Sequence, residues 1–243
     1  MQKEAWTWSS EYLSEPARLA RWGHFGTPVL LFPGAGGDFE EVERFHLIRA
    51  LEPLVAAGRM KVYSVDGLAM RTWLRATLAP EECARRQLLY DAFLYEEVVP
   101  RVRRDCQSAS LELVAAGVSF GAFYATTVLS LHPDVFRAAV GISGNYDLSA
   151  FLRGVPSSDF QRSSPLHFLP GLIEGPRLQQ LRRRTFILET GEGDLERPDP
   201  SRQLAAVLVA RAIPHSLRLR GATRHHDWSS WRELLPACLA ELT

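Results

Sequence analysis

The sequence predicts an α/β protein with a doubly wound, mostly parallel sheet. Short apolar runs alternate along the chain with segments of helical length, which is the pattern of strands joined by crossover helices. Several runs, such as 28–32 (PVLLF), are apolar throughout, as expected for strands buried on both faces of a parallel sheet. With 243 residues, 46% of them hydrophobic, the chain can form a sizeable core, and we expect one domain spanning 1–243.

Two further strands are expected near the N-terminus, at 5–13 and 17–25. The turn at Glu15 and Pro16 between them predicts an antiparallel edge of the sheet. The core strands are expected at 28–32, 60–65, 111–116, 136–142, 185–189 and 215–219.

Helices are expected between the core strands. Gly58 is typical of a helix end, and Pro80, followed by two glutamates, is typical of a helix start. The expected helices are 39–57, 80–104, 120–131, one within 195–212, and 227–242. Residues 145–183 contain four prolines and predict an irregular cap segment with one short helix at 176–183.

Composition argues against several classes of protein. The 28 basic and 28 acidic residues cancel, so the chain lacks the net positive charge typical of nucleic-acid binders. No run of 18 apolar residues predicts a membrane span, and no signal peptide is visible. The three cysteines are far apart and predict free thiols rather than a disulfide set or a zinc site. We therefore expect a cytoplasmic protein with no nucleic-acid or membrane partner and no metal or other cofactor.

The segment Gly117-Val118-Ser119-Phe120-Gly121 is the strongest chemical signal. It has the form G-x-S-x-G and lies between an expected core strand and an expected helix. That context predicts a nucleophile elbow, in which flanking glycines allow a tight turn to present the serine. Ser119 is therefore the predicted nucleophile.

A serine nucleophile needs a base and an acid, and on this type of sheet both follow later strands. Among the acids after strand 185–189 we favour Asp194, with Glu192 as the alternative. Two histidines follow strand 215–219, and we favour His226 over His225 as the base. Asp227, next to them, is expected to cap the last helix.

The predicted oxyanion hole has two backbone donors. The first is the N–H of Phe120, the residue after the nucleophile. The second should come from the loop 33–37, with Gly34 preferred and Ala35 next, since Pro33 has no N–H. The alternative interpretation, a phosphate-binding loop, is not supported, because neither G-x-G-x-x-G nor G-K-[ST] is present.

These motifs resemble the esterase D-like branch of the α/β-hydrolases, which includes S-formylglutathione hydrolases, feruloyl esterases and mycolyltransferases, and most of all its short bacterial members. The matching segments, which run through nearly the whole chain, are VLLFPGAGGDFEE (29–41), VDGLAMRTW (65–73), GVSFGAFYA (117–125), FRAAVGISGNYDL (136–148), TGEGDLE (190–196) and HHDWSSWRELLP (225–236). The resemblance implies the α/β-hydrolase fold and a triad of Ser119, Asp194 and His226. The chain departs from lipases in lacking an HGGG loop.

Residues 145–183 are the expected cap over the site. Trp73, Phe151 and Trp228 are the candidate substrate-binding residues, and Phe160, Phe168 and Leu169 are further candidates whose expected role is core packing. Three arginines of the cap are candidates for meeting an anion, although solvent exposure is the simpler expectation: Arg153, Arg162 and Arg177. Because the cap is proline-rich and partly polar, it predicts a small pocket for short acyl groups.

The predicted function is hydrolysis of a small carboxylic ester through an acyl-enzyme on Ser119. An acyltransferase with the same triad is the first alternative, in which a bound alcohol or amine replaces water. A non-catalytic binding protein on the same scaffold is the second, and it would be expected to lack one member of the triad.

Overall fold

The computed structural model describes residues 2–35 and 37–243. Eight strands form one sheet in the order β1-β2-β4-β3-β5-β6-β7-β8. From β4 to β8 neighbouring strands are parallel, whereas β1 pairs antiparallel with β2 and β2 antiparallel with β4. The strands are β1 Lys3–Trp8, β2 Ala17–Trp22, β3 Thr27–Phe32, β4 Met60–Val65, β5 Leu113–Val118, β6 Phe136–Ile142, β7 Thr185–Thr190 and β8 His215–Leu219. The predicted fold class is confirmed.

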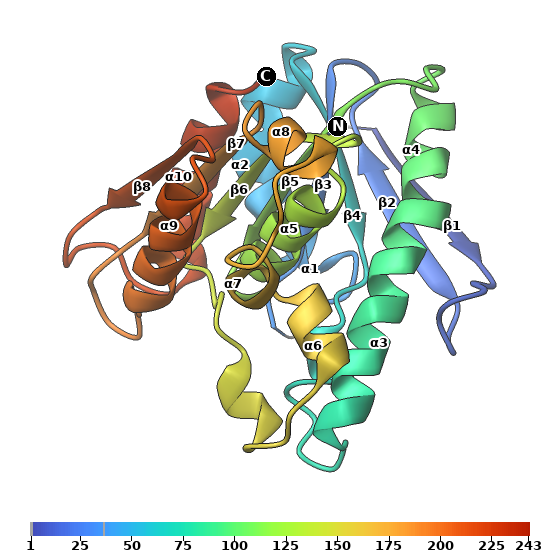
Figure 1. Cartoon of the computed structure of the whole chain (residues 1–243). Helices are drawn as coiled ribbons and strands as arrows, with labels where there is room; N and C mark the ends of the chain where they lie inside the picture. Colours follow the sequence, from blue (N-terminus) through green and yellow to red (C-terminus); the bar gives the residue numbers. More distant parts are fainter. Residues whose placement is uncertain (1, 36) are drawn as a thin grey trace.

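Helices cover both faces of this sheet (Figure 1). On one face, α2 (Leu47–Ala56) and α10 (Trp228–Ala240) share a hydrophobic cluster with side chains of the central strands. On the other face, α3 (Pro80–Phe93), α5 (Phe120–Leu131) and α9 (Asp199–Ala210) pack in a second cluster. The two clusters explain why the central strands are apolar along their whole length.

Some element boundaries differ from the sequence expectations. The helix expected at 39–57 is two helices, α1 (Glu41–Arg44) and α2, because His46 adopts a left-handed conformation with φ 62°. The helix expected at 80–104 is nearly continuous but contains a π-helical turn, Leu94–Val98, before α4 (Val99–Asp105). The strand expected at 111–116 is shifted to β5, where Gly117 and Val118 pair with Gly141 and Ile142.

The expected cap segment contains more helix than the sequence suggested. It forms a 3₁₀ turn at Ser149–Leu152 and then α6 (Ser158–Ser163), α7 (Pro165–Phe168) and α8 (Pro176–Leu181). Phe160, Leu169 and Leu178 are fully buried, so much of the segment is part of the core. Figure 1 shows its first part, in yellow, below the sheet and beside α3. The division of the chain into one domain with a cap stays a prediction.

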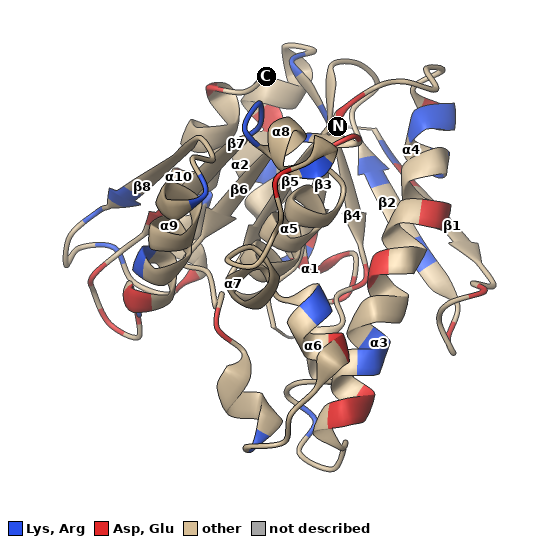
Figure 2. Ribbon diagram, viewed as in Figure 1, with Lys and Arg blue, Asp and Glu red and all other residues tan. Residues whose placement is uncertain are grey.

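Charged residues of both signs are spread over the elements seen in Figure 2, without one basic or acidic face in that view. This agrees with the balanced composition. Within the described residues, no helix is long and apolar enough to cross a membrane.

Candidate active site

The turn after β5 places Ser119 at the start of α5. Ser119 has φ 54° and ψ −119°, which is a strained conformation for a residue with a side chain. Two glycines permit the turn: a Cβ on Gly117 would lie 2.2 Å from the backbone of Gly121, and a Cβ on Gly121 would lie 2.3 Å from the carbonyl oxygen of Phe32. The helix start therefore abuts the end of β3, which brings loop 33–37 next to the serine.

Ser119 meets the predicted histidine. The Nε2 atom of His226 lies 3.0 Å from Oγ of Ser119, a hydrogen-bond distance. Ser119 is 5% exposed and the His226 side chain 22% exposed, so the pair lies just below the surface. A backbone hydrogen bond from the His226 N–H to the carbonyl of Asp194 (3.1 Å) holds the histidine loop in place.

The carboxylate that faces His226 belongs to Glu196. Its Oε2 atom lies 3.6 Å from Nδ1 of His226, longer than an ordinary hydrogen bond but on the ring atom opposite the serine. Catalytic contacts are often long without substrate and tighten when it binds. The Glu196 side chain is only 1% exposed. Serine, imidazole and carboxylate thus form a continuous row.

A network of donors surrounds the Glu196 carboxylate. Ser143 donates to Oε1 at 2.5 Å and Thr190 donates to Oε2 at 3.0 Å. Ser143 in turn accepts a hydrogen bond from Nε1 of Trp231 at 3.1 Å. Burial alone would raise the pKa of Glu196, but the contacts with His226, Ser143 and Thr190 outweigh it and hold the pKa below its ordinary value. Glu196 is therefore charged at neutral pH.

Asp194 does not occupy the position expected for the acid. Its side chain is 95% exposed, and its carboxylate lies 3.7 Å from the ring of His225 rather than against His226. The His225 ring accepts the backbone N–H of Asp194 at 2.9 Å. The structure thus does not place the Asp194 carboxylate against His226, and the geometry favours Glu196 as the candidate acid.

The remaining candidates for acid have other partners. Glu192 is exposed and lies 3.5 Å from Arg202. Asp227 accepts the Ser230 N–H at 2.8 Å and caps α10, the role expected for it.

The sequence carried only a weak signal for Glu196. Three acids stand at alternate positions in the segment 192–196, and the spacing does not show which one turns inward. The direction of the Glu196 side chain depends on Leu195, whose φ of 62° reverses the chain immediately before Glu196. A leucine in that conformation is uncommon and has no sequence signature.

The two loop donors proposed for the oxyanion hole are not equivalent. The N–H of Gly34 donates to the buried carboxylate of Glu41 at 2.6 Å, so it already has a partner. This bond argues against Gly34 as the free donor and leaves Ala35, the second choice, as the candidate. Phe120 begins α5 directly after Ser119, where a helix leaves backbone N–H groups free to donate. Gly36, within the same loop, lies outside the described residues.

Aromatic side chains lie next to the nucleophile. The ring of Phe120 is 5.9 Å from that of Phe151, which is 6.3 Å from that of Trp73. Trp73 is 4% exposed and donates to Gln87 at 2.7 Å, so its ring is fixed. Phe151 and Trp73 therefore stay candidates for the wall of a substrate pocket.

Trp228 packs among other aromatic rings. It stacks on Phe45 with 4.7 Å between ring centroids and meets Trp231 edge-to-face at 4.9 Å, and Trp231 in turn contacts the ring of His226. These contacts indicate a packing role for Trp228.

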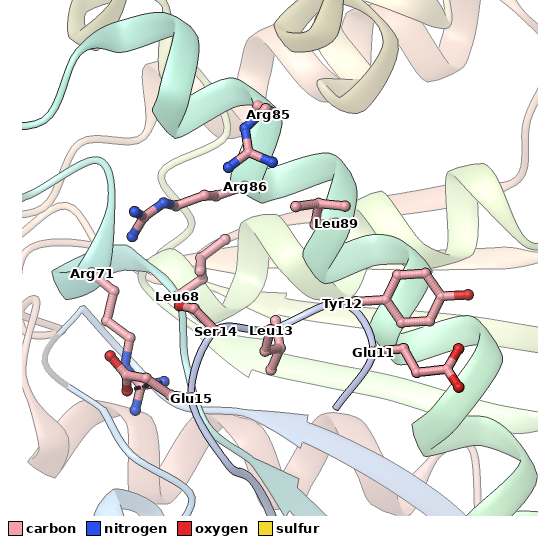
Figure 3. Close-up of a pocket in the computed structure, with 10 residues that line it drawn as sticks. All are labelled: Glu11, Tyr12, Leu13, Ser14, Glu15, Leu68, Arg71, Arg85, Arg86 and Leu89. Carbon is pink, nitrogen blue, oxygen red and sulfur yellow. Dashed lines mark ion pairs between the residues drawn. The ribbon is translucent and has the colours of Figure 1, made fainter. Parts of the chain in front are cut away.

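Two cavities are relevant to ligand binding. One of about 380 Å³ is bordered by His226 and by loops that follow β6 and β7. The other, of about 340 Å³, lies between residues 11–15, the loop after β4 and helix α3 (Figure 3). Its arginines are already paired: Arg71 with Glu15, and both Arg85 and Arg86 with Glu82. None of the predicted catalytic residues borders this second cavity.

No group of three or more His, Cys, Asp or Glu side chains is arranged to hold a metal ion, as far as residues 2–35 and 37–243 are concerned. The row of Ser119, His226 and Glu196 is suited to nucleophilic acyl transfer, in which the protein's own side chains supply nucleophile, base and acid.

The comparison with protein families gives one match, to the family described as "Putative esterase", over residues 70–242. The chain belongs to this esterase family. The match covers the elbow, the cap segment and both loops that carry Glu196 and His226. The esterase is thus an enzyme of ester hydrolysis, and the resemblance to the esterase D-like branch of the α/β-hydrolases is confirmed.

Solved structures similar to the esterase share its fold at low sequence identity. A ferulic acid esterase is 18% identical with a TM-score of 0.76, covering 100% of this chain and 97% of its own. An S-formylglutathione hydrolase from Agrobacterium tumefaciens is 16% identical with a TM-score of 0.71, covering 98% and 93%. The fluorophosphonate-binding serine hydrolase F of Staphylococcus aureus is 14% identical with a TM-score of 0.67, covering 98% and 97%. No curated protein matches the sequence.

Proposed function

We propose that this esterase is a serine carboxylic-ester hydrolase with Ser119 as nucleophile, His226 as base and Glu196 as acid. The observation that carries the proposal is the position of the His226 ring, 3.0 Å from Ser119 Oγ on one side and 3.6 Å from a buried Glu196 oxygen on the other. The substrate proposed is a small carboxylic ester with a short acyl group.

The first half of the reaction acylates the enzyme. The Ser119 oxygen attacks the ester carbonyl carbon while its proton passes to Nε2 of His226. The charged Glu196 stabilises the imidazolium that forms and keeps Nδ1 protonated. The tetrahedral intermediate collapses as the carbon–oxygen bond to the alcohol breaks, and the alcohol oxygen takes the proton from Nε2.

The second half returns the serine. Water gives a proton to Nε2 and attacks the acyl carbonyl, and the new intermediate releases the acid as Ser119 regains its proton. The His226 side chain is 22% exposed, so water can reach it. This exposure favours hydrolysis over the alternative of acyl transfer to a bound acceptor.

The carbonyl oxygen gains negative charge in both tetrahedral intermediates. The N–H of Phe120 and that of Ala35 are the proposed donors to it. In such sites one donor is commonly worth about 10²–10³ in kcat. The positive end of α5 adds to the stabilisation because Ser119 immediately precedes the helix.

The test is covalent labelling followed by turnover. A fluorophosphonate should add to Ser119, located by mass spectrometry of the peptides, and the folded protein should hydrolyse p-nitrophenyl acetate. Ser119→Ala should abolish both, whereas Ser149→Ala, a serine of the 3₁₀ turn in the cap, should change neither. A folded protein in which Ser119 remains unlabelled would rule out the proposal and favour the non-catalytic alternative.

A further inference from the structure

The cavity beside His226 contains an arginine that the reaction does not use. About 380 Å³ in volume, the cavity lies between the loop after β6, the segment preceding α9 and the catalytic histidine. Phe151, Leu195 and Pro200 provide apolar surface, and Arg197 provides a guanidinium. A space of this size holds a small organic group, and the guanidinium of Arg197 suggests that this group carries a negative charge.

None of the carboxylates near Arg197 in the sequence pairs with it. Glu192 and Asp199 both pair with Arg202, at 3.5 and 2.9 Å, and the exposed Asp194 lies 3.7 Å from His225. Glu196 accepts from Ser143 and Thr190 and faces His226. No side chain of the described residues forms an ion pair with Arg197, which leaves its charge available to a ligand.

The arginines that the sequence suggested for this role are occupied. Arg153 donates to the carbonyl of Ala76, and Arg177 donates to that of Ser130. Arg162 pairs with Asp159. None of the three borders the cavity beside His226. The arginines of the cavity in Figure 3, Arg71, Arg85 and Arg86, also differ from Arg197 because each of them forms an ion pair with a glutamate.

We infer that this cavity binds the alcohol half of an ester that carries a carboxylate, and that Arg197 is the counter-ion of that carboxylate. The inference rests on the proposed function. The alcohol half is assigned because His226, which borders the cavity, must protonate the leaving oxygen. A guanidinium can meet a carboxylate with two parallel hydrogen bonds, which orients as well as attracts it.

Asp147 limits the charge that the cavity accepts. Its carboxylate also borders the cavity and accepts the Ser149 N–H at 2.9 Å, without pairing with Arg197. A second negative group on the ligand would be repelled there. The matching ligand is therefore a monocarboxylate attached to an apolar body, rather than a phosphate ester or a polyanion.

The experiment compares 4-acetoxybenzoate with 4-acetoxybenzamide, which have the same acyl group and nearly the same shape but differ in charge. The ratio of their kcat/KM values is measured for the wild type and for Arg197→Gln, so that intrinsic reactivity cancels. We expect the substitution to lower the ratio about fivefold, mainly through KM of the anionic ester, as for an exposed ion pair. Added salt should lower the ratio in the wild type and leave it unchanged in the variant.

Arg202→Gln is the matched control, because Arg202 belongs to the adjacent helix and is already paired. It should leave the ratio as in the wild type. A second pair of substrates, p-nitrophenyl hemisuccinate and p-nitrophenyl butyrate, places the carboxylate on the acyl half. If Arg197→Gln changes this ratio instead, the assignment to the alcohol half is wrong.

Two further outcomes separate this inference from the proposed function. If Ser119 takes the fluorophosphonate but Arg197→Gln changes neither ratio, the cavity does not bind a carboxylate-bearing alcohol half and the inference is overturned. The inference is also overturned if Ser119 is labelled but neither acetoxy ester is hydrolysed. If Ser119 is not labelled and no ester is hydrolysed, the proposed function itself fails.

Discussion

The carboxylate of Glu41 accepts the backbone N–H of Gly34 at 2.6 Å, inside the loop that carries the proposed oxyanion donor Ala35. Glu41 is buried at the start of α1. A Cβ on Gly37 would lie 2.5 Å from Oε2 of Glu41, so the carboxylate also packs against the far side of the loop. Glu41 thus holds both sides of the loop and is a positioning residue for it.

Glu41→Leu should displace the loop that carries Ala35, because it removes the acceptor of the Gly34 N–H. Glu41→Gln should largely preserve the position of the loop, because the Gln side-chain oxygen can still accept that N–H. For Glu41→Leu we expect kcat to fall about 10–100-fold, less than the full loss of a donor. Affinity for a boronic acid that mimics the tetrahedral intermediate should fall in parallel, while KM changes little. Equal losses of kcat in both variants would contradict this role.

The charge of Glu41 also predicts how stability depends on pH. Burial raises the pKa of Glu41 above its ordinary value of 4.5, despite the Gly34 N–H and Arg44 acting in the opposite direction. A carboxyl that binds its proton more tightly in the folded state loses stability as pH rises through its folded pKa. The free energy of unfolding of Glu41→Gln minus that of the wild type should therefore be larger near pH 7 than near pH 4, measured by urea unfolding, so that the variant gains stability relative to the wild type as the pH rises.

The choice between Glu196 and Asp194 is open to direct test. Removing the orienting carboxylate of a triad lowers kcat by about 10⁴, and for Glu196→Gln we expect a loss of about 10³–10⁴ with the fold intact. Asp194→Asn should stay within about twofold of the wild type, since its side chain is 95% exposed and faces His225. If Asp194→Asn were the damaging substitution, the loop would have to rearrange when substrate binds.

The contrast between Glu196 and Asp194 shows which parts of the site could be predicted from the sequence and which could not. The elbow is a local feature: G-x-S-x-G between a strand and a helix specifies the turn, which is why Ser119 could be predicted as the nucleophile. The order of the strands predicted only the loop that carries the base, and both His225 and His226 lie in that loop. The acid depends on where loop 191–196 turns, and that is set by the backbone of Leu195 and by hydrogen bonds to loop 221–226, such as Gly193 N–H to Arg224 O. Contacts between distant loops leave no periodic pattern in a sequence.

The oxyanion loop and the helices show the same limit. Apolar runs predicted the core strands because a strand that is buried on both faces of the sheet consists almost entirely of apolar residues. The preference for Gly34 did not anticipate that its N–H donates to a carboxylate seven residues later, because nothing in the spacing reveals that bond. The break at His46 likewise depends on a left-handed residue that propensity does not foresee.

Ser143 should act on the reaction through Glu196. It donates to the Glu196 carboxylate and accepts from Trp231, so Ser143→Ala removes one donor from the acid and leaves the Trp231 N–H without its partner. We expect kcat/KM to fall about tenfold, a smaller loss than for Glu196→Gln, in line with the effect of removing groups that orient functional side chains.

A structural role alone would not change the titration of Glu196, and this separates the two explanations. Hydrogen bonding to the charged form lowers the pKa of Glu196, so losing Ser143 should raise it toward its ordinary value. Activity of Ser143→Ala should therefore decline at a higher pH than that of the wild type as the solution is acidified. A uniform loss of activity at every pH, with lower thermal stability, would show that Ser143 only supports the fold.

Acyl chain length is the remaining property that the structure addresses. The rings of Trp73 and Phe151 lie close to Phe120, and Phe160 packs edge-to-face on Trp73 with 5.6 Å between centroids. The surrounding segment is tied to the body of the protein: Gln87 donates to Ser163 at 2.9 Å within the buried interior. It therefore resembles a fixed wall more than a lid that opens.

A fixed aromatic wall limits the gain from longer acyl chains. Each buried methylene adds about 0.8 kcal/mol, but only while the pocket has room for it. Across a series of p-nitrophenyl esters we expect kcat/KM to be highest between acetyl and hexanoyl and to fall for longer chains. Phe151→Ala should move the optimum to longer chains, because it removes a ring 5.9 Å from that of Phe120 that stands between the acyl side and the cavity beside His226. A kcat/KM that keeps rising through dodecanoyl and palmitoyl esters in the wild type would mean that the wall moves aside.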